Sequence, residues 1–223
     1  KPGCSVMNGA IRRVRHDAAA LLFSVVAFAL LAVGPTAHAA GFTPSFFGTK
    51  ELHGTSLKQF PKWTGVMDRF AKELAGCPAN LCNTKLWKNI IAQAKDMDLK
   101  TKLKTINNIM NAHPYILDQV NWGKPDYWAT PFEFLRKNGD CEDYAIAKFY
   151  ALRDSGVSTD QMRIVALNDL NLGLGHAILV VYVEGTPMVL DNQIQKVVPA
   201  SSIKHYKPVY SVNDTGWWLH RPA

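Results

Sequence analysis

Cys141 stands at a position where a thiol could act as a nucleophile. It lies within Gly139-Asp-Cys-Glu-Asp-Tyr-Ala145, a segment that opens a predicted helix. The N-terminus of a helix carries partial positive charge, which lowers the pKa of a nearby thiol. The backbone N–H groups of the first turn have no partners inside the helix, so they could also hold an oxyanion. The segment therefore has the chemistry needed for attack on a carbonyl carbon.

Such a thiol needs a base, and the base needs an orienting carboxylate. His176 begins the strongest predicted strand, and Asp191 ends the next one. If these strands form a hairpin through residues 184–187, alternation places both side chains on the same face. They are then about four positions out of line, so the twist of the sheet, a bulge or an earlier turn must bring them together.

Each of these three residues also has an ordinary structural explanation. A lone cysteine is commonly a buried hydrophobic residue, a histidine at a strand edge is commonly satisfied by structural contacts, and an aspartate after a strand commonly forms a turn. The functional interpretation depends on their order along the chain: a cysteine at a helix start, then a histidine and an aspartate on successive strands. This order is a papain-like Cys-His-Asp layout for covalent catalysis.

The elements that would position these residues change in type along the chain. Apolar residues at helical spacing predict helices over 57–74, 86–94 and 99–110, and a further helix that opens within 139–145 and ends at Ser155-Gly156. Short β-branched runs divided by turn residues predict strands over 162–167, 176–183, 187–190 and 196–198. Helices followed by strands indicate an α+β domain, with a helical N-terminal half packed on an antiparallel sheet.

Two segments are predicted to lack regular structure. Residues 41–56 contain several Gly and Pro residues and are predicted to form an irregular lead-in. Residues 121–140 combine Gly, Pro, Asp and Asn with five aromatic residues. We interpret them as a loop that forms a wall of the site, although packing in a core is the commoner role of aromatic side chains.

Composition limits the class of protein. The chain has 223 residues, 48% hydrophobic and 19% charged, which suits one globular domain and excludes a disordered, collagen-like or coiled-coil protein. Residues 1–39 contain basic residues, an apolar run over 18–33 and a small-residue A-x-A site, the order of a secretory signal. The run is shorter than the roughly 20 residues that span a bilayer, which disfavours an uncleaved anchor. We therefore predict a signal segment over 1–39 and an exported domain over 40–223.

The charge and the cysteines of the exported part narrow its partners. Removal of the signal segment takes away four cations and one anion, so the formal charge falls from +7 to +4. This small charge, without a basic stripe, argues against nucleic-acid binding. In an oxidising compartment, Cys77-Pro-Ala-Asn-Leu-Cys82 is interpreted as a local disulfide. Zinc is the alternative for this pair, but no second Cys or His pair has suitable spacing.

Four segments together resemble one known family. They are Trp128-Ala-Thr-Pro-Phe-Glu133, Gly139-Asp-Cys-Glu-Asp-Tyr-Ala-Ile-Ala-Lys148, Gly175-His-Ala-Ile-Leu179 and Leu190-Asp-Asn192. They are similar to those of the bacterial transglutaminase-like cysteine peptidases, the LapG family, and the similarity runs from about Lys50 to the C-terminus. The resemblance implies a papain/transglutaminase-like fold in which Cys141 is the nucleophile, His176 the general base and acid, and Asp191 the orienting residue.

The same resemblance implies a biological role. Members of the family are periplasmic endoproteases that cleave a large surface adhesin near its N-terminus, at a site with paired alanines, which releases the adhesin and disperses the biofilm. They need calcium, and an inner-membrane cyclic-di-GMP receptor holds them inactive when that messenger is abundant. We therefore expect a periplasmic protein with an adhesin as substrate and this receptor as inhibitory partner.

The acids beside Cys141 have two interpretations. Asp140 and Glu142 match the calcium-binding acids of the family, and Asp143 is a further candidate ligand. Hard oxygen ligands in a loop suit calcium. In the alternative, Asp140 is a helix N-cap, while Glu142 and Asp143 complement the helix dipole and mimic a capping box. Residue physics favours capping, whereas the resemblance favours calcium with a structural role next to the nucleophile.

Two rival functions use the same residues. One is acyl transfer to an amine, as in a transglutaminase or an amidase, which the sequence does not separate from hydrolysis. The other is a calcium-dependent binding module with an inactive site, against which the intact Cys, His and Asp set argues. Either reaction of an acyl-thioester needs oxyanion donors. We expect the backbone N–H of Cys141 to be one and the 121–135 segment to supply the second, with Trp128 as the candidate.

Overall fold

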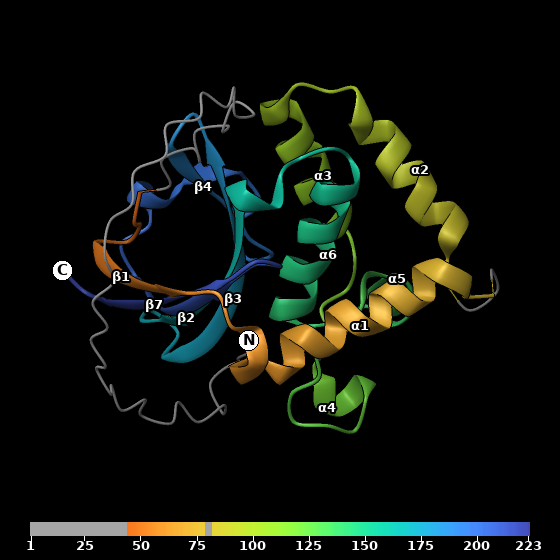
Figure 1. Cartoon of the computed structure of the whole chain (residues 1–223), viewed down its shortest axis with the longest axis horizontal. Helices are drawn as coiled ribbons and strands as arrows, with labels where there is room; N and C mark the ends of the chain where they lie inside the picture. Colours follow the sequence, from red (N-terminus) through yellow and green to blue (C-terminus); the bar gives the residue numbers. More distant parts are fainter. Residues whose placement is uncertain (1–43, 79–81) are drawn as a thin grey trace, which may run out of the picture.

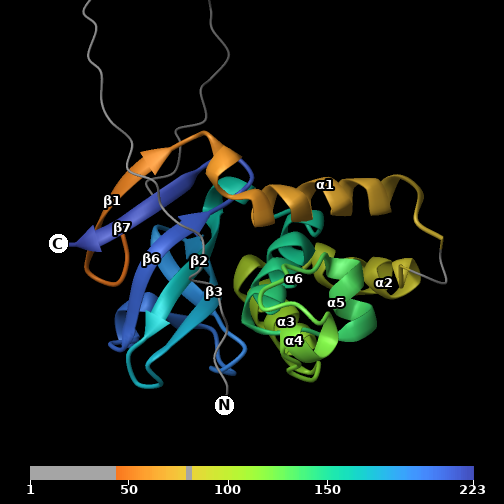
Figure 2. The same cartoon turned by 90° about the horizontal axis from the view of Figure 1, so that it is seen from below.

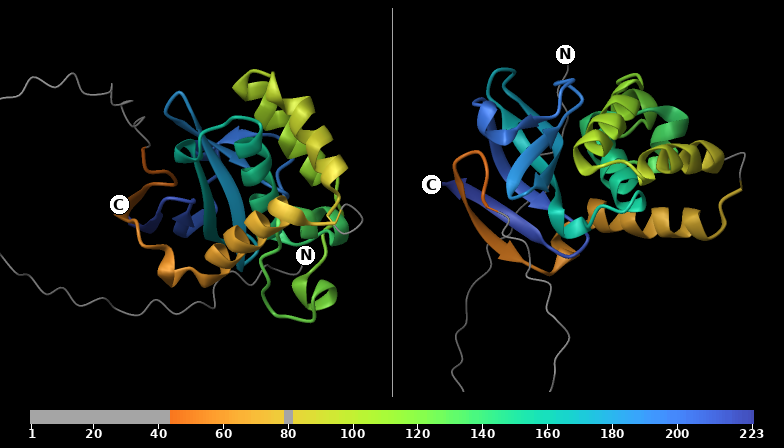
Figure 3. Two further views of the ribbon diagram at one scale, coloured as in Figure 1. Left: turned by 45° about the vertical axis from the view of Figure 1, so that its right-hand side comes forward. Right: turned by 90° about the horizontal axis from the view of Figure 1, so that it is seen from above.

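The computed structural model describes residues 44–78 and 82–223, and the predicted signal segment over 1–39 lies outside them. The chain forms two layers, with helices on one side and a single sheet on the other (Figure 1). Figure 2 and Figure 3 show the same separation from other directions. No helix in this part of the chain is long and apolar enough to cross a membrane. The predicted α+β class, with helices packed on an antiparallel sheet, is confirmed.

Helices occupy most of the first half of the domain. The α-helices of the described residues are α1 (Pro61–Gly76), α2 (Thr84–Lys95), α3 (Leu99–Asn111), α4 (Asp118–Asn121), α5 (Pro131–Lys137) and α6 (Cys141–Asp154). Short 3-10 helices are η1 (Leu57–Gln59), η2 (Thr159–Gln161) and η3 (Ala200–Ser202). The four helices predicted from apolar spacing correspond to η1 with α1, then α2, α3 and α6. A disulfide between Cys77 and Cys82, with Cα atoms 6.0 Å apart, lies between α1 and α2.

α6 is the central helix of the domain. Every residue from Cys141 to Leu152 is buried, as expected for a helix surrounded by other elements rather than laid on a surface. It packs against β2 and β3 of the sheet and against α2, α3 and α5. Its end is a Schellman motif: Gly156 has φ +96°, its N–H bonds Arg153 O at 3.0 Å, and Val157 N bonds Leu152 O at 3.0 Å. The packing of α6 against the sheet and the other helices fixes the position of its N-terminal end, where Cys141 lies.

One antiparallel sheet holds all the strands of the described residues. They are β1 (Thr49–Gly54), β2 (Met162–Asp169), β3 (Leu174–Val183), β4 (Thr186–Leu190), β5 (Val198–Pro199), β6 (Tyr206–Val212) and β7 (Trp217–Pro222), in the order β1-β7-β6-β2-β3-β4-β5. Alternate residues of the central strands enter two different cores. Leu179 and Val181 pack on the helix side, whereas Ile178 and Val180 belong to a second core with Tyr206.

Two predictions about irregular segments were wrong. The lead-in over 41–56 contains β1, an edge strand paired with β7. Its sequence has no apolar face and Leu52 is 49% exposed, so ladder hydrogen bonds rather than burial hold it. The loop over 121–140 contains α5, which begins with a capping box in which Thr130 and Glu133 exchange hydrogen bonds of 2.8 and 3.2 Å.

Candidate active site

Cys141 is the first residue of α6, at the positive end of the helix dipole. Its Sγ atom lies 3.2 Å from Glu142 Oε2. α6 packs against β3, the strand that carries His176, so the predicted nucleophile and base belong to adjoining elements. Within residues 44–78 and 82–223, no hydrogen bond joins Cys141 to His176.

The β3–β4 hairpin determines how His176 and Asp191 meet. Its loop is Glu184–Gly185, with φ of 51° and 78°, as in a two-residue type I′ turn. The ladder, continued past Leu190, sets Asp191 opposite Ile178, which is two positions from His176 on the same strand. The expected offset of about four positions was therefore too large, because the turn is earlier and shorter than a loop over 184–187. With an offset of two positions, His176 and Asp191 are diagonal neighbours on the same face of the sheet.

His176 and Asp191 are in direct contact. Nε2 of the imidazole lies 3.0 Å from Asp191 Oδ1, and both residues are 1% exposed. The other ring nitrogen, Nδ1, lies 3.3 Å from Gln193 Nε2. When Nε2–H donates to Asp191, Nδ1 keeps its lone pair and can accept a proton from a thiol. Gln193 was missed by the sequence analysis, because only the path of the chain after β4 brings its amide beside the ring.

Three groups donate hydrogen bonds to the carboxylate of Asp191. His176 Nε2 and Gln193 N, the latter at 2.8 Å, donate to Oδ1, and the Tyr206 hydroxyl donates to Oδ2 at 2.6 Å. Burial acts to raise the pKa of Asp191, but the hydrogen bond and charge of His176, with the other two donors, outweigh it and hold the pKa below its usual value. Asp191 is therefore ionised at neutral pH. It can orient the imidazole and stabilise its protonated form.

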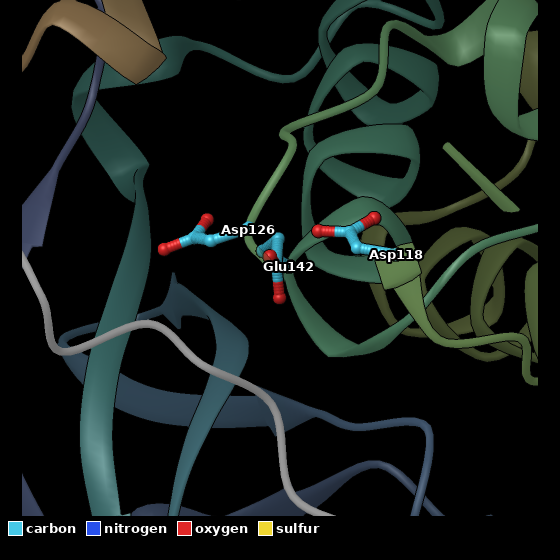
Figure 4. A group of neighbouring side chains, drawn as sticks. All are labelled: Asp118, Asp126 and Glu142. Atoms are coloured by element: carbon cyan, nitrogen blue, oxygen red, sulfur yellow. The ribbon is translucent and has the colours of Figure 1, made fainter. Parts of the chain in front are cut away.

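Acidic side chains gather at the N-terminal end of α6. Asp118, Asp126 and Glu142 form one group, and Asp118, Asp140 and Asp143 a second, each with carboxylate oxygens within 4.8 Å of one another. Figure 4 shows the first group, in which Asp118 comes from α4, Glu142 from α6 and Asp126 from the loop after α4. The three acids predicted beside Cys141 all belong to these groups. Asp118 and Asp126 were missed, and the only available signal was that Asp126 lies in the segment interpreted as a wall of the site.

Burial leaves most of these carboxylates short of partners. Burial and the charge of Asp140 raise the pKa of Asp118 to about 7. Burial also raises the pKa of Asp140, and burial with the charges of Asp140 and Asp143 raises that of Glu142 well above its usual value. In the described part of the chain, the Oδ1 atoms of Asp118, Asp126 and Asp140 have no hydrogen-bond partner. Clustered buried acids with unused oxygens are a donor set suited to a hard divalent cation.

Asp143 differs from the other acids because both of its oxygens accept backbone hydrogen bonds. Ala129 N donates to Oδ1 at 2.7 Å, and Asp140 N donates to Oδ2 at 3.3 Å. The second bond belongs to the capping geometry that the sequence left as an alternative to metal binding. The structure groups Glu142 with Asp118 and Asp126, and groups Asp140 and Asp143 with Asp118, but of the three predicted acids Asp143 is the one whose two oxygens both accept backbone N–H groups.

Trp128, the candidate oxyanion donor, lies beside this capped turn. It is 4% exposed, and its indole Nε1 has no hydrogen-bond partner among residues 44–78 and 82–223. Its backbone oxygen accepts a hydrogen bond from Arg69 Nη2. The next residue, Ala129, is bonded to Asp143 in the first turn of α6. An indole N–H that is buried without a partner can donate to a ligand that enters the site.

Comparisons with known proteins agree on one group of relatives. Residues 76–220 match the model of a family described as bacterial transglutaminase-like cysteine proteinase. LapG of Legionella pneumophila has a similar solved structure, with 38% sequence identity, a TM-score of 0.55, and coverage of 60% of this chain and 76% of that chain. Its calcium-bound form has a TM-score of 0.56 over the same shares, and an EGTA-treated form 0.55 over 60% and 74%, both at 38% identity. No curated protein matched the chain.

Proposed function

Because this chain belongs to the bacterial transglutaminase-like cysteine proteinase family, and is therefore a cysteine peptidase, we propose that it is an exported, calcium-dependent endopeptidase of a large surface adhesin. The observation that carries the catalytic part is the 3.0 Å contact between His176 and Asp191, beside the helix that begins with Cys141. The identity of 38% to the Legionella protein, which has a calcium-bound structure, supports the choice of metal. Export to the periplasm rests on the signal segment predicted over 1–39.

The reaction follows from the roles of three side chains. Asp191 holds Nε2–H of His176, which leaves Nδ1 to take the proton of the Cys141 thiol. The thiolate attacks the scissile carbonyl carbon, and the C–N bond breaks as the imidazolium gives its proton to the departing amine. Water then hydrolyses the thioester with His176 again as base, which releases the new carboxylate and restores the thiol.

Two donors stabilise the charge that develops on the carbonyl oxygen. The backbone N–H of Cys141 belongs to the first turn of α6, where N–H groups have no partner inside the helix. The indole N–H of Trp128 is the second donor, since it is buried and makes no hydrogen bond within the described residues. Removal of one such donor typically lowers kcat by about 10²- to 10³-fold.

Calcium would be held by Asp118, Asp126, Asp140 and Glu142. The oxygens that remain for it are well defined, because Oδ2 of Asp118 accepts from Tyr127 N and Oδ2 of Asp126 accepts from Lys62, while their Oδ1 atoms are unused. When bound, calcium supplies positive charge that offsets these carboxylates and ties the segment after α4 to the first turn of α6. The donor set therefore fits the metal, with the protein itself doing the proton transfer.

The biological role that we propose comes from the family. The substrate is the N-terminal region of a large surface adhesin, cut at a site with paired alanines, and the cut promotes biofilm dispersal. An inner-membrane cyclic-di-GMP receptor is the inhibitory partner. A gene neighbourhood that encodes such an adhesin and such a receptor would support this assignment.

The test is cleavage of a purified adhesin-type domain with a paired-alanine site. The exported chain is incubated with calcium, with chelator, and with calcium restored after chelation, beside Cys141→Ala as the inactive control. We expect two peptide products with calcium, none with chelator, and recovery on restoration. Asp98→Asn, which removes one carboxylate oxygen at the exposed N-terminus of α3, should behave as the unmodified chain.

Three outcomes would contradict parts of this proposal. Cleavage that is unaffected by the chelator would show that calcium is not required and would favour the helix-capping interpretation of the acids. A product cross-linked to an added amine, with no new peptide ends, would favour acyl transfer over hydrolysis. No cleavage under any condition, with Cys141 also unreactive to a thiol reagent, would favour a binding module.

A further inference from the structure

Asp143 joins two segments that meet at the nucleophile. One carboxylate oxygen accepts a hydrogen bond from Ala129 N at 2.7 Å, and the other accepts from Asp140 N at 3.3 Å. Asp143 itself is completely buried. A buried carboxylate with both oxygens bonded to backbone N–H groups holds its partners in a fixed geometry, because breaking either bond leaves a charge or a donor unpaired.

The segment that Asp143 holds is the one that carries Trp128. Trp128 is bonded at its backbone oxygen to Arg69, and the following N–H is the one bonded to Asp143. Arg69 also lies 3.7 Å from Glu133, whose carboxylate belongs to the capping box of α5. The C=O and the N–H of the peptide unit between Trp128 and Ala129 are therefore both hydrogen-bonded to side chains. The indole N–H of Trp128 is the donor that no described residue uses.

Gly139 leaves the space that this arrangement needs. A Cβ atom on Gly139 would lie 2.1 Å from Asp143 Oδ2 and 2.6 Å from Asp143 Cβ, far inside van der Waals contact. Any other residue at this position would push the Asp143 carboxylate away from Asp140 N. Gly139 and Asp143 thus form one unit, and the Gly-Asp-Cys-Glu-Asp sequence contains it together with the nucleophile.

Asp143 belongs with Asp118 and Asp140 to the second acidic group, but its carboxylate oxygens are used differently. Asp118, Asp126 and Asp140 each have an Oδ1 atom with no hydrogen-bond partner in the described residues, whereas both oxygens of Asp143 accept N–H groups. A metal at Asp143 would compete with two existing hydrogen bonds. The hydrogen bonds therefore indicate that Asp143 positions the backbone, whereas the neighbouring acids with an unused oxygen are the ones that suit a metal.

We propose that Asp143 is a positioning residue that sets the Trp128 indole N–H against the backbone N–H of Cys141, so that the two donors form one oxyanion site, and that it is not a calcium ligand. This inference rests on the proposed cysteine-peptidase reaction and deepens it. Asp143 acts through Ala129 and Trp128 rather than on the substrate. Its loss should slow steps that form an oxyanion and spare steps that do not.

The experiment compares two reactions of the same thiol with calcium saturating. Acylation by p-nitrophenyl acetate passes through an oxyanion, whereas alkylation by iodoacetamide displaces iodide and forms none. In Asp143→Asn the amide keeps one acceptor but sets an NH₂ group against a backbone N–H, so the indole is misplaced. We expect acylation to fall by at least about tenfold, approaching the 10²-fold loss of a missing oxyanion donor, while alkylation stays within about twofold.

A double-mutant cycle tests whether Asp143 acts through Trp128. Trp128→Phe should lower acylation by about 10²-fold, and Asp143→Asn should add almost nothing in that background, because the two residues act as a unit. Gly139→Ala, which keeps both side chains and displaces Asp143, should reproduce the Asp143→Asn loss if the latter variant folds poorly. Asp98→Asn, at the N-cap of α3, is the matched control and should change neither reaction.

The results that overturn the proposal are distinct from those that overturn the reaction. Additive losses in the cycle, or equal losses of acylation and alkylation, would show that Asp143 only supports the fold. Weaker calcium binding by Asp143→Asn, measured by competition with a chelating dye, would make it a ligand. An unmodified chain that iodoacetamide alkylates and p-nitrophenyl acetate never acylates would refute the peptidase reaction itself, and the oxyanion role with it.

Discussion

The hydroxyl of Tyr206 gives a direct measure of how the fold supports the catalytic carboxylate. It donates to Asp191 Oδ2 at 2.6 Å, whereas His176 and Gln193 N donate to the other oxygen. Asp191 is 1% exposed, so water does not readily replace a lost donor. Tyr206→Phe removes this hydroxyl, keeps the ring in the second core, and leaves Oδ2 of an ionised carboxylate without a donor.

The size of the effect follows from the charge and the burial. A hydrogen bond to a charged group contributes about 1.5–3 kcal/mol, and burial of the bare oxygen places the loss at about 2–3 kcal/mol of unfolding free energy at pH 7. The Tyr206 hydroxyl is one of the donors that lower the pKa of Asp191, so that pKa should rise in the variant. The pKa of Asp191 is depressed in the folded chain, so its contribution is present above the unfolded pKa, near 4. That contribution is lost as the pH falls through the depressed value.

Urea unfolding in chelator tests this reasoning without a contribution from metal binding. The difference between the unmodified chain and Tyr206→Phe should be constant from pH 5 to 8 and should narrow below about pH 4. Tyr210→Phe is the matched control, because Tyr210 lies on the same strand and its hydroxyl makes no hydrogen bond within the described residues. A loss no larger than that of Tyr210→Phe, or a difference that grows as the pH falls, would refute the argument.

Three further predictions concern the thiol and the acids. Cys141→Ala should abolish cleavage on a gel while the melting temperature changes little, and residual cleavage would contradict its role as nucleophile. In chelator the chain should be less stable at pH 7.5 than at pH 5.5 by urea unfolding, because the pKa of Asp118 is raised to about 7 and its ionisation opposes folding over that range. Calcium at about 100 times its Kd should add about 2.7 kcal/mol to the free energy of unfolding, which raises the melting temperature by roughly 5–11 °C. This increase should be larger at pH 7.5 than at pH 5.5 and much smaller in Asp118→Asn. An increase that does not depend on Asp118 would place the metal elsewhere.

The sequence predicted well the parts of the site whose signals are local. The helix that begins at Cys141 has its start and stop signals within a few residues of its ends, and the structure begins and ends it there. The shared face of His176 and Asp191 follows from strand alternation alone, which a small error in the turn does not change. The distance between them does depend on the turn, and the choice of Glu184–Gly185 over a longer loop sets it.

The parts that the sequence missed depend on contacts between distant segments. Asp118 reaches the acids of α6 because the chain before it lies beside Gly139, where Ile116 N bonds Gly139 O at 2.9 Å. No periodicity or motif near residue 118 encodes that neighbour. β1 was missed for a related reason, since its residues form a strand only because β7 supplies a partner. Long-range pairing of this kind requires the fold.

Two electrostatic effects act in opposite directions on the thiol at the first turn of α6. Their balance gives the proposed calcium an electrostatic role in addition to its structural one. The helix dipole favours negative charge on Cys141, but ionised Asp140 and Glu142, backed by Asp118 and Asp126, oppose it from the same end of the helix. The raised pKa values of Asp118, Asp140 and Glu142 show that burial and the charges of neighbouring acids already resist their ionisation. A divalent cation among them offsets both the repulsion and the field at Sγ. Calcium bound there would therefore favour the thiolate as well as the fold, so activity and stability should depend on the same carboxylates.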